Sequence, residues 1–172
     1  MASLAIIPAR GGSKRIPKKN IKLFLGKPII TYSIETALKS NIFDEVMVST
    51  DDQEIKDIAI KNGAKVPFLR SDENSNDFST LSDVLIEVLE KYKKHMKFFD
   101  SVCCILPTAA LLSSKKIIES YKRLIESISK TIVPVIKFPY PIQRSLKEEQ
   151  GFLRMREIEH LNTRSQDLED YY

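Results

Sequence analysis

A chain of 172 residues, 42% of them apolar, has the size of one domain and can fill a hydrophobic core. Its formal net charge of +4 is modest, and its aromatic residues do not interleave with a basic stripe, so the sequence shows no nucleic-acid-binding pattern. It contains no secretory signal before the first apolar segment and no apolar run of membrane-spanning length, which predicts a cytoplasmic protein that does not bind membranes.

The only cysteines, Cys103 and Cys104, are neighbours in an apolar run. On a strand their side chains would point to opposite faces, so we expect reduced thiols and no disulfide between them. With only two histidines in the chain, a metal site built from cysteine and histidine is not expected.

Residues 4–20, LAIIPARGGSKRIPKKN, join an apolar run to a run of positive charge. Residues 4–9 read as a buried parallel strand. Residues 10–20, here called the basic loop, carry five cations and no acid: Arg10, Lys14, Arg15, Lys18 and Lys19. Glycines at 11 and 12 let a ligand approach backbone N–H groups, so the basic loop predicts a polyphosphate site. It matches neither GxxxxGK[ST] nor GxGxxG, and a solvated basic turn or a generic polyanion-binding module are the alternatives.

Strand and helix patterns alternate after the basic loop. A short alternating segment covers 21–25. Helices are expected over 28–40 and 53–61, and two more are expected to begin near 79–82 and at 113–114. Strands are expected over 45–50, 64–69, 101–106 and 131–138. We expect the strand at 101–106 to be fully buried. The alternation predicts an α/β domain with a mostly parallel sheet over residues 1–138.

Two further segments are polar. The loop at 70–80, RSDENSNDFST, is longer than a simple connection, which favours a functional role. Residues 139–172 begin with prolines and are strongly charged, which predicts an extended arm that packs on the parent sheet or on a partner in a homodimer. The acids at 51 and 52 follow a strand, and we interpret them as a helix N-cap in preference to metal ligands.

The string IPARGGSKRIPKKNI resembles the N-terminal signature of the cytidylyltransferases that activate nonulosonic (sialic-acid-like) sugars. The similarity extends through GKPII at 26–30 and STDD at 49–52 over nearly the whole chain, and is greatest to the pseudaminic acid branch. It implies a three-layer αβα fold of the nucleotide-diphospho-sugar transferase (Rossmann-like) type. It also implies a reaction in which CTP and a nonulosonic acid give the CMP-sugar and pyrophosphate. A CMP-sialic acid synthetase and a non-catalytic CTP-binding fragment are the alternatives.

The resemblance also implies roles for individual residues. Arg10 and Lys14 would hold the triphosphate, Lys19 would lie near the α-phosphate, and Asn20 would orient the nucleotide or the attacking group. Of these, Arg10, Lys19 and Asn20 are the expected catalytic residues. The full expected nucleotide site is Ala9, Arg10, Gly11, Gly12, Ser13, Lys14, Lys19, Asn20, Arg70 and Ser79.

For the sugar, the resemblance implies a site of Thr108, Gln143, Arg144, Arg164 and Gln166. Arg164 is the candidate for the sugar carboxylate, because arginine pairs bidentately with carboxylates. Sialic acid enzymes commonly have Gln where this chain has Leu106, so we expect a more apolar sugar face, which suits a deoxygenated sugar such as pseudaminic acid.

The family binds Mg²⁺ through carboxylates in a further strand and helix. This chain ends at Tyr172 before that point, so we expect Mg²⁺ as cofactor but no metal ligand within these residues. The sequence is then either a fragment or a shortened product.

Overall fold

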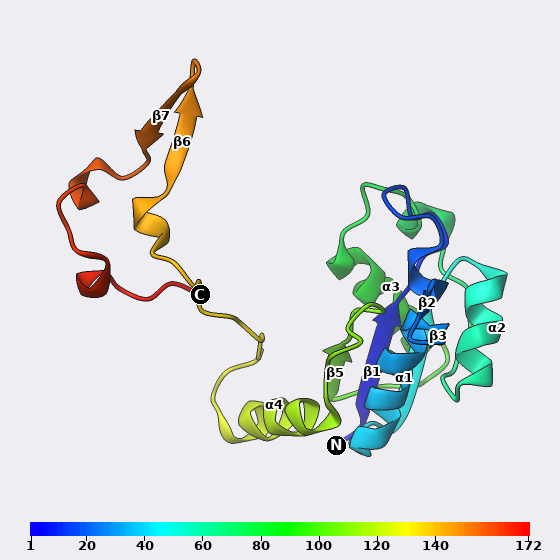
Figure 1. Cartoon of the computed structure of the whole chain (residues 1–172). Helices are drawn as coiled ribbons and strands as arrows, with labels where there is room; N and C mark the ends of the chain where they lie inside the picture. The colour runs from blue at the N-terminus through cyan, green and yellow to red at the C-terminus, as the bar shows by residue number, and fades with distance from the viewer. The chain divides into compact units, whose positions relative to one another are not determined.

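The computed structural model describes all residues, 1–172, in two compact units, Met1–Ile128 and Ser129–Tyr172 (Figure 1). No helix in it has both the length and the apolar character needed to cross a membrane. The sequence-based boundary, between 138 and 139, falls inside the second unit.

The first unit alternates strands with helices, as the hydrophobic pattern predicts. Its elements are β1 (Ser3–Pro8), the 3₁₀ turn η1 (Lys19–Ile21), β2 (Leu23–Phe24), β3 (Lys27–Pro28), α1 (Ile29–Ser40), β4 (Glu45–Ser49), α2 (Gln53–Lys61), the 3₁₀ turn η2 (Asp72–Asn74), α3 (Leu81–Lys94), β5 (Ser101–Cys104) and α4 (Ser114–Glu126).

The sheet has the order β4-β1-β5, with β1 parallel to both neighbours. Ile6 of β1 is aligned with Met47 on one side and with Cys104 on the other. Because the strands are parallel, their carboxyl ends lie at one edge, and open α/β sheets bind ligands beyond that edge. The basic loop therefore leaves β1 at the edge where a ligand is expected.

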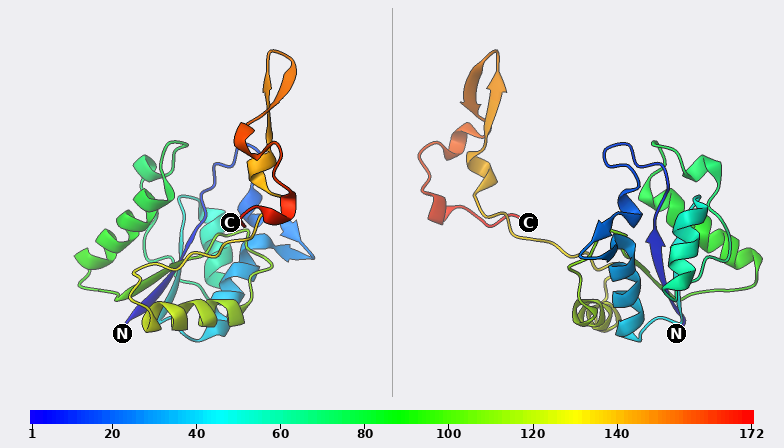
Figure 2. Two further views of the ribbon diagram at one scale, coloured as in Figure 1. Left: turned by 90° about the vertical axis from the view of Figure 1, so that its left-hand side faces the viewer. Right: turned by 45° about the vertical axis from the view of Figure 1, so that its right-hand side comes forward.

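Helices cover both faces of this sheet, because successive side chains of β1 point in opposite directions (Figures 1 and 2). Ala5 and Ile7 belong to a core that includes buried residues of α1, α2 and α4. Leu4 and Ile6 pack instead with Val88 and Tyr92 of α3. The expected αβα layering is confirmed.

Three helices begin at caps of the kind the sequence signals. Asp52 accepts a 3.0 Å hydrogen bond from the N–H of Ile55 and caps α2, which has the predicted bounds. Ser113 caps α4, and Thr80 forms a capping box with Asp83 at the start of α3. Asp52 therefore has the predicted capping role.

Three strand predictions need correction. Residues 64–69 make one isolated bridge, between Lys65 and Met47, because Pro67 has no N–H with which to extend the ladder. The strand at 101–106 ends at Cys104 and is not fully buried: it lies at the edge of the three-stranded sheet, and Val102 is 37% exposed. Residues 131–138 form no strand, since they pair with no other strand and contain Pro134.

The second unit contains a hairpin within the expected extended arm. Its elements are η3 (Ile142–Arg144), β6 (Leu146–Glu149), β7 (Phe152–Met155), η4 (Ile158–His160) and η5 (Ser165–Asp167). The two strands pair in antiparallel fashion around Gln150 and Gly151, both of which have positive φ, as a tight hairpin turn requires.

Candidate active site

The basic loop lines a hollow of about 350 Å³ at the carboxyl edge of the sheet. The hollow brings together five of the expected nucleotide-site residues with Arg15 and an acid of the loop at 70–80; the full lining is Arg10, Ser13, Lys14, Arg15, Lys19, Asn20 and Asp77. The Nζ of Lys19 has no partner within the chain. An unpaired cation in a basic hollow suits an anionic ligand.

Gly11 lies in contact with the two acids that follow β4. Its N–H donates a 2.8 Å hydrogen bond to Oδ1 of Asp51. A Cβ atom on Gly11 would lie 2.6 Å from Oδ2 of Asp52, whereas one on Gly12 would meet nothing within 4 Å. Close approach, and not a left-handed backbone, therefore requires glycine at position 11. Because the Gly11 N–H is already bonded, only the Gly12 N–H of this pair is left to meet a phosphate.

Asn20 is 5% exposed and joins η1 to the start of the basic loop. Its Nδ2 donates a 2.9 Å hydrogen bond to the carbonyl of Arg10. Its buried Oδ1 has no hydrogen-bond partner. An unpaired buried acceptor is costly, so one beside a basic hollow favours a ligand that brings a donor.

Asp77 is a site residue that the sequence analysis does not single out. Arg10 donates to the carbonyl of Asn76 at 2.5 Å through Nη1 and to Oδ1 of Asp77 at 2.8 Å through Nη2. Lys14 forms an ion pair with the other oxygen of Asp77. These hydrogen bonds, from Lys14 first and then from Arg10, lower the pKa of Asp77. The only sequence signal for Asp77 is its place in the long polar loop.

Arg70 is buried, interacts electrostatically with Arg10 and does not line the hollow. Its Nε donates to Oγ of Ser49 at 3.1 Å and its Nη2 to the Ser49 carbonyl at 2.5 Å, so it holds the carboxyl end of β4. Burial lowers the pKa of Arg70, and the carboxylates of Asp51 and Glu87 oppose that shift. A structural role for Arg70 is visible here; the contact with a base remains a prediction.

Ser79 is also absent from the lining of the hollow. Its hydroxyl donates to the carbonyl of Glu73 at 2.8 Å, and its N–H donates to Oδ1 of Asn76 at 3.0 Å. Both bonds lie within the loop at 70–80. Ser79 is therefore part of the turn that presents Asp77 to the basic loop.

Glu87, on α3, fixes the other end of that loop and was missed by sequence reasoning. Its carboxylate accepts hydrogen bonds from the N–H and hydroxyl of Ser71 and from Nδ2 of Asn74, and pairs with Lys91. Burial disfavours the charged carboxylate, but these donors outweigh it and lower the pKa of Glu87 to about 2. A lone Glu in a helix gives no local signal of such a role.

The predicted sugar residues are divided between the two units. Thr108 is exposed just beyond β5. Nearby Leu106 is 54% exposed, and its carbonyl accepts a 2.9 Å hydrogen bond from the hydroxyl of Ser33. In the second unit, Gln143 is buried, and its Nε2 donates to the Glu169 carbonyl at 2.9 Å.

The remaining predicted sugar residues lie close together within the second unit. Arg144 donates to Oγ of Ser165 at 3.2 Å. Arg164 binds both oxygens of Asp167, at 2.7 and 3.2 Å, so its guanidinium already holds a carboxylate. Gln166 lines a hollow of about 480 Å³ whose walls include Phe138, Tyr140 and Tyr171.

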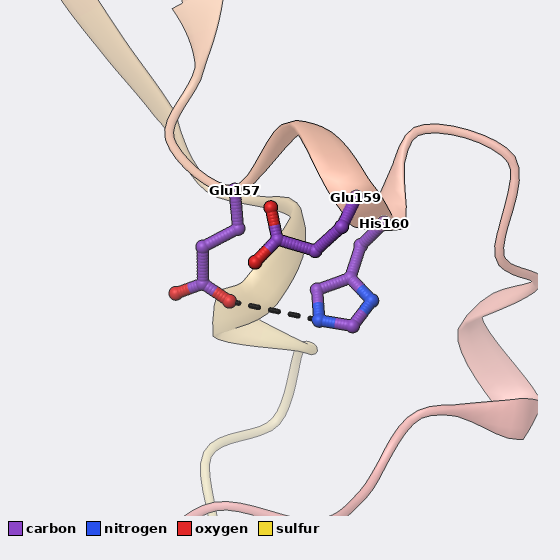
Figure 3. Close-up of side chains that lie close together, drawn as sticks. All are labelled: Glu157, Glu159 and His160. Atoms are coloured by element: carbon purple, nitrogen blue, oxygen red, sulfur yellow. Dashed lines mark ion pairs between the residues drawn. The ribbon is translucent and has the colours of Figure 1, made fainter.

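One cluster has metal-ligating side chains: Glu157, Glu159 and His160 in the second unit (Figure 3). Nε2 of His160 lies 3.7 Å from Oε2 of Glu157, and Glu159 is exposed. Exposed acids of this kind are common without a metal.

Residues 4–164 match the protein family described as Cytidylyltransferase. The chain belongs to the cytidylyltransferase family. It is 46% identical to the pseudaminic acid cytidylyltransferase of Campylobacter jejuni serotype O:2, over the whole of this chain and 75% of that protein. It is also 46% identical to the CMP-N,N'-diacetyllegionaminic acid synthase of Legionella pneumophila, over 63% of this chain and 47% of that protein.

Solved structures support the fold of this cytidylyltransferase. CMP:2-keto-3-deoxy-manno-octonic acid synthetase complexed with CTP aligns with a TM-score of 0.62 and 25% identity, over 73% of this chain and 48% of that chain. A cytidylyltransferase from Leptospira borgpetersenii aligns with a TM-score of 0.58 and 22% identity, over 76% of this chain and 51% of that chain. The expected nucleotidyltransferase fold is confirmed.

Proposed function

We propose that this cytidylyltransferase transfers CMP from CTP to a nonulosonic acid, with pseudaminic acid as the favoured sugar, and releases pyrophosphate. The observation that carries the proposal is the hollow of the basic loop, where Arg10, Lys14 and Lys19 converge at the carboxyl edge of a parallel sheet. The relatives that match this chain over its whole length are named pseudaminic acid cytidylyltransferases.

In this reaction the anomeric hydroxyl oxygen of the sugar attacks the α-phosphorus of CTP. A new P–O bond forms, the bond from the α-phosphorus to the pyrophosphate oxygen breaks, and the proton of the hydroxyl is lost to solvent. Such transfers depend on positioning and on neutralising charge. Arg10 and Lys14 would hold the β- and γ-phosphates, and Lys19 would stabilise the charge that develops on the departing pyrophosphate. The unpaired Oδ1 of Asn20 would accept a hydrogen bond from a ribose or sugar hydroxyl.

The acids beside the basic loop do not fit a magnesium site. Asp51 accepts the Gly11 N–H, Asp52 caps α2, and Asp77 is paired with Arg10 and Lys14. Mg²⁺, when bound, supplies neutralising charge to a triphosphate. We propose Mg²⁺ as the cofactor, held by ligands other than these residues.

For the sugar, exposed Leu106 would present an apolar surface beside Thr108. An apolar surface favours a deoxygenated sugar, because a hydroxyl placed there would lose its hydrogen bonds to water. We expect pseudaminic acid to give a higher kcat/KM than sialic acid, and Leu106→Gln to narrow the difference. Equal turnover of both sugars by the wild type would contradict the role of Leu106.

We also propose a homodimer that uses the second unit. Its apolar side chains are strongly exposed: Phe152 and Leu153 are each 70% exposed and Ile158 is 75% exposed. Such exposure is typical of a surface that a partner covers. Sedimentation analysis of the wild type should give twice the chain mass. The double variant Phe152→Ser with Leu153→Ser should have a mass closer to that of the monomer. A monomeric wild type would contradict the proposed dimer.

The decisive experiment measures pyrophosphate release from CTP, pseudaminic acid and Mg²⁺ by the purified chain. Release that requires both substrates supports the proposal. CTP binding without release would indicate a non-catalytic nucleotide-binding fragment. Equal binding of CTP, other nucleoside triphosphates and unrelated polyanions, again without release, would indicate a polyanion-binding module.

A further inference from the structure

The carboxylate of Asp77 is paired with Arg10 and Lys14, the two cations that are expected to hold the triphosphate. Its Oδ1 lies 2.8 Å from Nη2 of Arg10, and its Oδ2 is paired with Nζ of Lys14. One carboxylate therefore serves both cations, with one oxygen each. Two anionic oxygens bridging an arginine and a lysine reproduce the way a phosphate group would bind them.

We propose that Asp77 is an internal substitute for phosphate: its carboxylate occupies Arg10 and Lys14 in the nucleotide-free protein, and a polyphosphate binds by displacing it. The inference rests on the proposed function, because it takes the basic loop as the triphosphate site. Asp77 thereby sets the affinity of the site for every polyphosphate that uses these two cations.

The exposure of the ion pairs makes this displacement feasible. The side chains of Arg10 and Asp77 are about one-third exposed, and that of Lys14 is 82% exposed. Ion pairs in contact with water are weak, so a ligand with several negative charges competes well against a single carboxylate. Lys19, which has no partner, remains available for the first contact with such a ligand.

The loop at 70–80, which carries Asp77, contacts both α3 and the basic loop. Ser71 and Asn74 are bonded to the largely buried Glu87 on α3. The turn at 76–79 is bonded to Glu73 of the same loop, and its contacts outside the loop come from Arg10 and Lys14. Loss of the contacts with Arg10 and Lys14 would leave the turn at 76–79, which includes Ser79, bonded to Glu73, so that the turn could move relative to the basic loop when a nucleotide binds.

Displacement of Asp77 weakens the binding of every polyphosphate at the basic loop. Each polyphosphate must break the same two ion pairs, so CTP and pyrophosphate are both held more weakly than the cations alone would hold them. Weaker binding of pyrophosphate speeds its release after the transfer. Removing the charge of Asp77 should therefore tighten binding of both.

The test is titration calorimetry with inorganic tripolyphosphate, which carries the triphosphate charge without ribose or base. Asp77→Asn should bind it about three- to tenfold more tightly than the wild type, the range expected for two exposed ion pairs. Asp77→Glu, which keeps the charge, should stay near the wild type. Asp72→Asn, which removes a charge from the same loop without touching the basic loop, should also be unchanged.

The possible results separate this inference from the proposed function. Tighter binding by Asp77→Asn alone supports the inference. If the wild type binds CTP and releases pyrophosphate but Asp77→Asn binds tripolyphosphate equally or more weakly, the inference is wrong and the proposed function stands. If neither protein binds tripolyphosphate or CTP, both are wrong. Circular dichroism and thermal unfolding establish that each variant is folded.

Discussion

The N–H of Gly11 donates a 2.8 Å hydrogen bond to the carboxylate of Asp51. This bond ties the basic loop, which follows β1, to the residues that follow β4. The parallel pairing of the two strands makes the contact possible, because it places their carboxyl ends side by side. Asp52 fills the space next to Gly11 while it caps α2. The shape of the basic loop therefore depends on two acids about 40 residues away in sequence.

Gly11→Ala should destabilise the protein and weaken CTP binding. The added Cβ would lie 2.6 Å from Oδ2 and 2.9 Å from Cβ of Asp52, so the cap of α2 or the basic loop must shift. Overpacking of this kind costs about 1–3 kcal/mol. Gly12→Ala is the matched control, because its Cβ would meet nothing within 4 Å. Urea unfolding and CTP titration of both variants measure the effect; equal behaviour of the two would contradict it.

Lys19→Ala should reduce pyrophosphate release by about a hundredfold or more while the fold is retained, since one cation at a developing charge contributes about 3 kcal/mol. Lys19 lines the hollow and has no ion-pair partner, so its removal breaks no ion pair or side-chain hydrogen bond of the free protein. Steady-state rates with saturating CTP and sugar measure the loss. Lys22→Ala, an exposed lysine outside the hollow, is the control and should keep the wild-type rate. Full activity of Lys19→Ala would refute the phosphate role.

Stability should fall with acid in a way that depends on Glu87. Its pKa is about 2 in the folded protein against an ordinary value of 4.5, so the folded state favours the charged form. A depressed pKa contributes stability that is complete above pH 4.5 and is lost as the pH falls toward 2. The shift corresponds to at most about 3 kcal/mol.

Glu87→Gln isolates this effect. At pH 7 its free energy of unfolding should be lower than that of the wild type, and the difference should shrink as the pH approaches 2. Urea unfolding at pH 7, 4 and 3 gives the comparison. Glu90→Gln is the control on the same helix, because the exposed Glu90 makes no ion pair. A difference that stays constant with pH would rule out the assigned cause.

Tyr92→Phe should lower stability without changing catalysis. The Tyr92 hydroxyl donates to buried Glu45, which also pairs with Lys97 and Lys65. Burial, and then the hydrogen bond to Glu45 and the charge of that carboxylate, raise the pKa of Tyr92, so the hydroxyl stays protonated and donates at every working pH. Losing this donor to a charged group should cost about 1–3 kcal/mol.

The measurement for Tyr92→Phe is thermal unfolding together with the rate of pyrophosphate release. Glu45 begins β4, at the opposite end of the strand from the basic loop, so kcat should be unchanged. Tyr121→Phe, on α4 and without a hydrogen bond, is the control and should unfold at the wild-type temperature. A loss of kcat without a loss of stability would contradict a purely structural role.

The sequence by itself determined the alternation of strands and helices and the place of the cations. Apolar runs and caps such as Asp52 and Ser113 are local signals, and parallel strands bring whatever follows them to one edge. Local patterns could not show that residues 64–69 make only one bridge or that 131–138 pairs with no strand, because pairing depends on which partners the fold supplies.

Only the tertiary structure decided what the basic loop touches. Asp77 lies 67 residues from Arg10, and Asp51 lies 40 residues from Gly11, and no periodicity joins such positions. Glu87 likewise has its role because α3 packs beside the loop at 70–80. The strand order β4-β1-β5 and the packing of α3 bring Asp51 and Asp77 to the basic loop. The sequence therefore shows where the charges lie along the chain, and only the fold shows which of them pair.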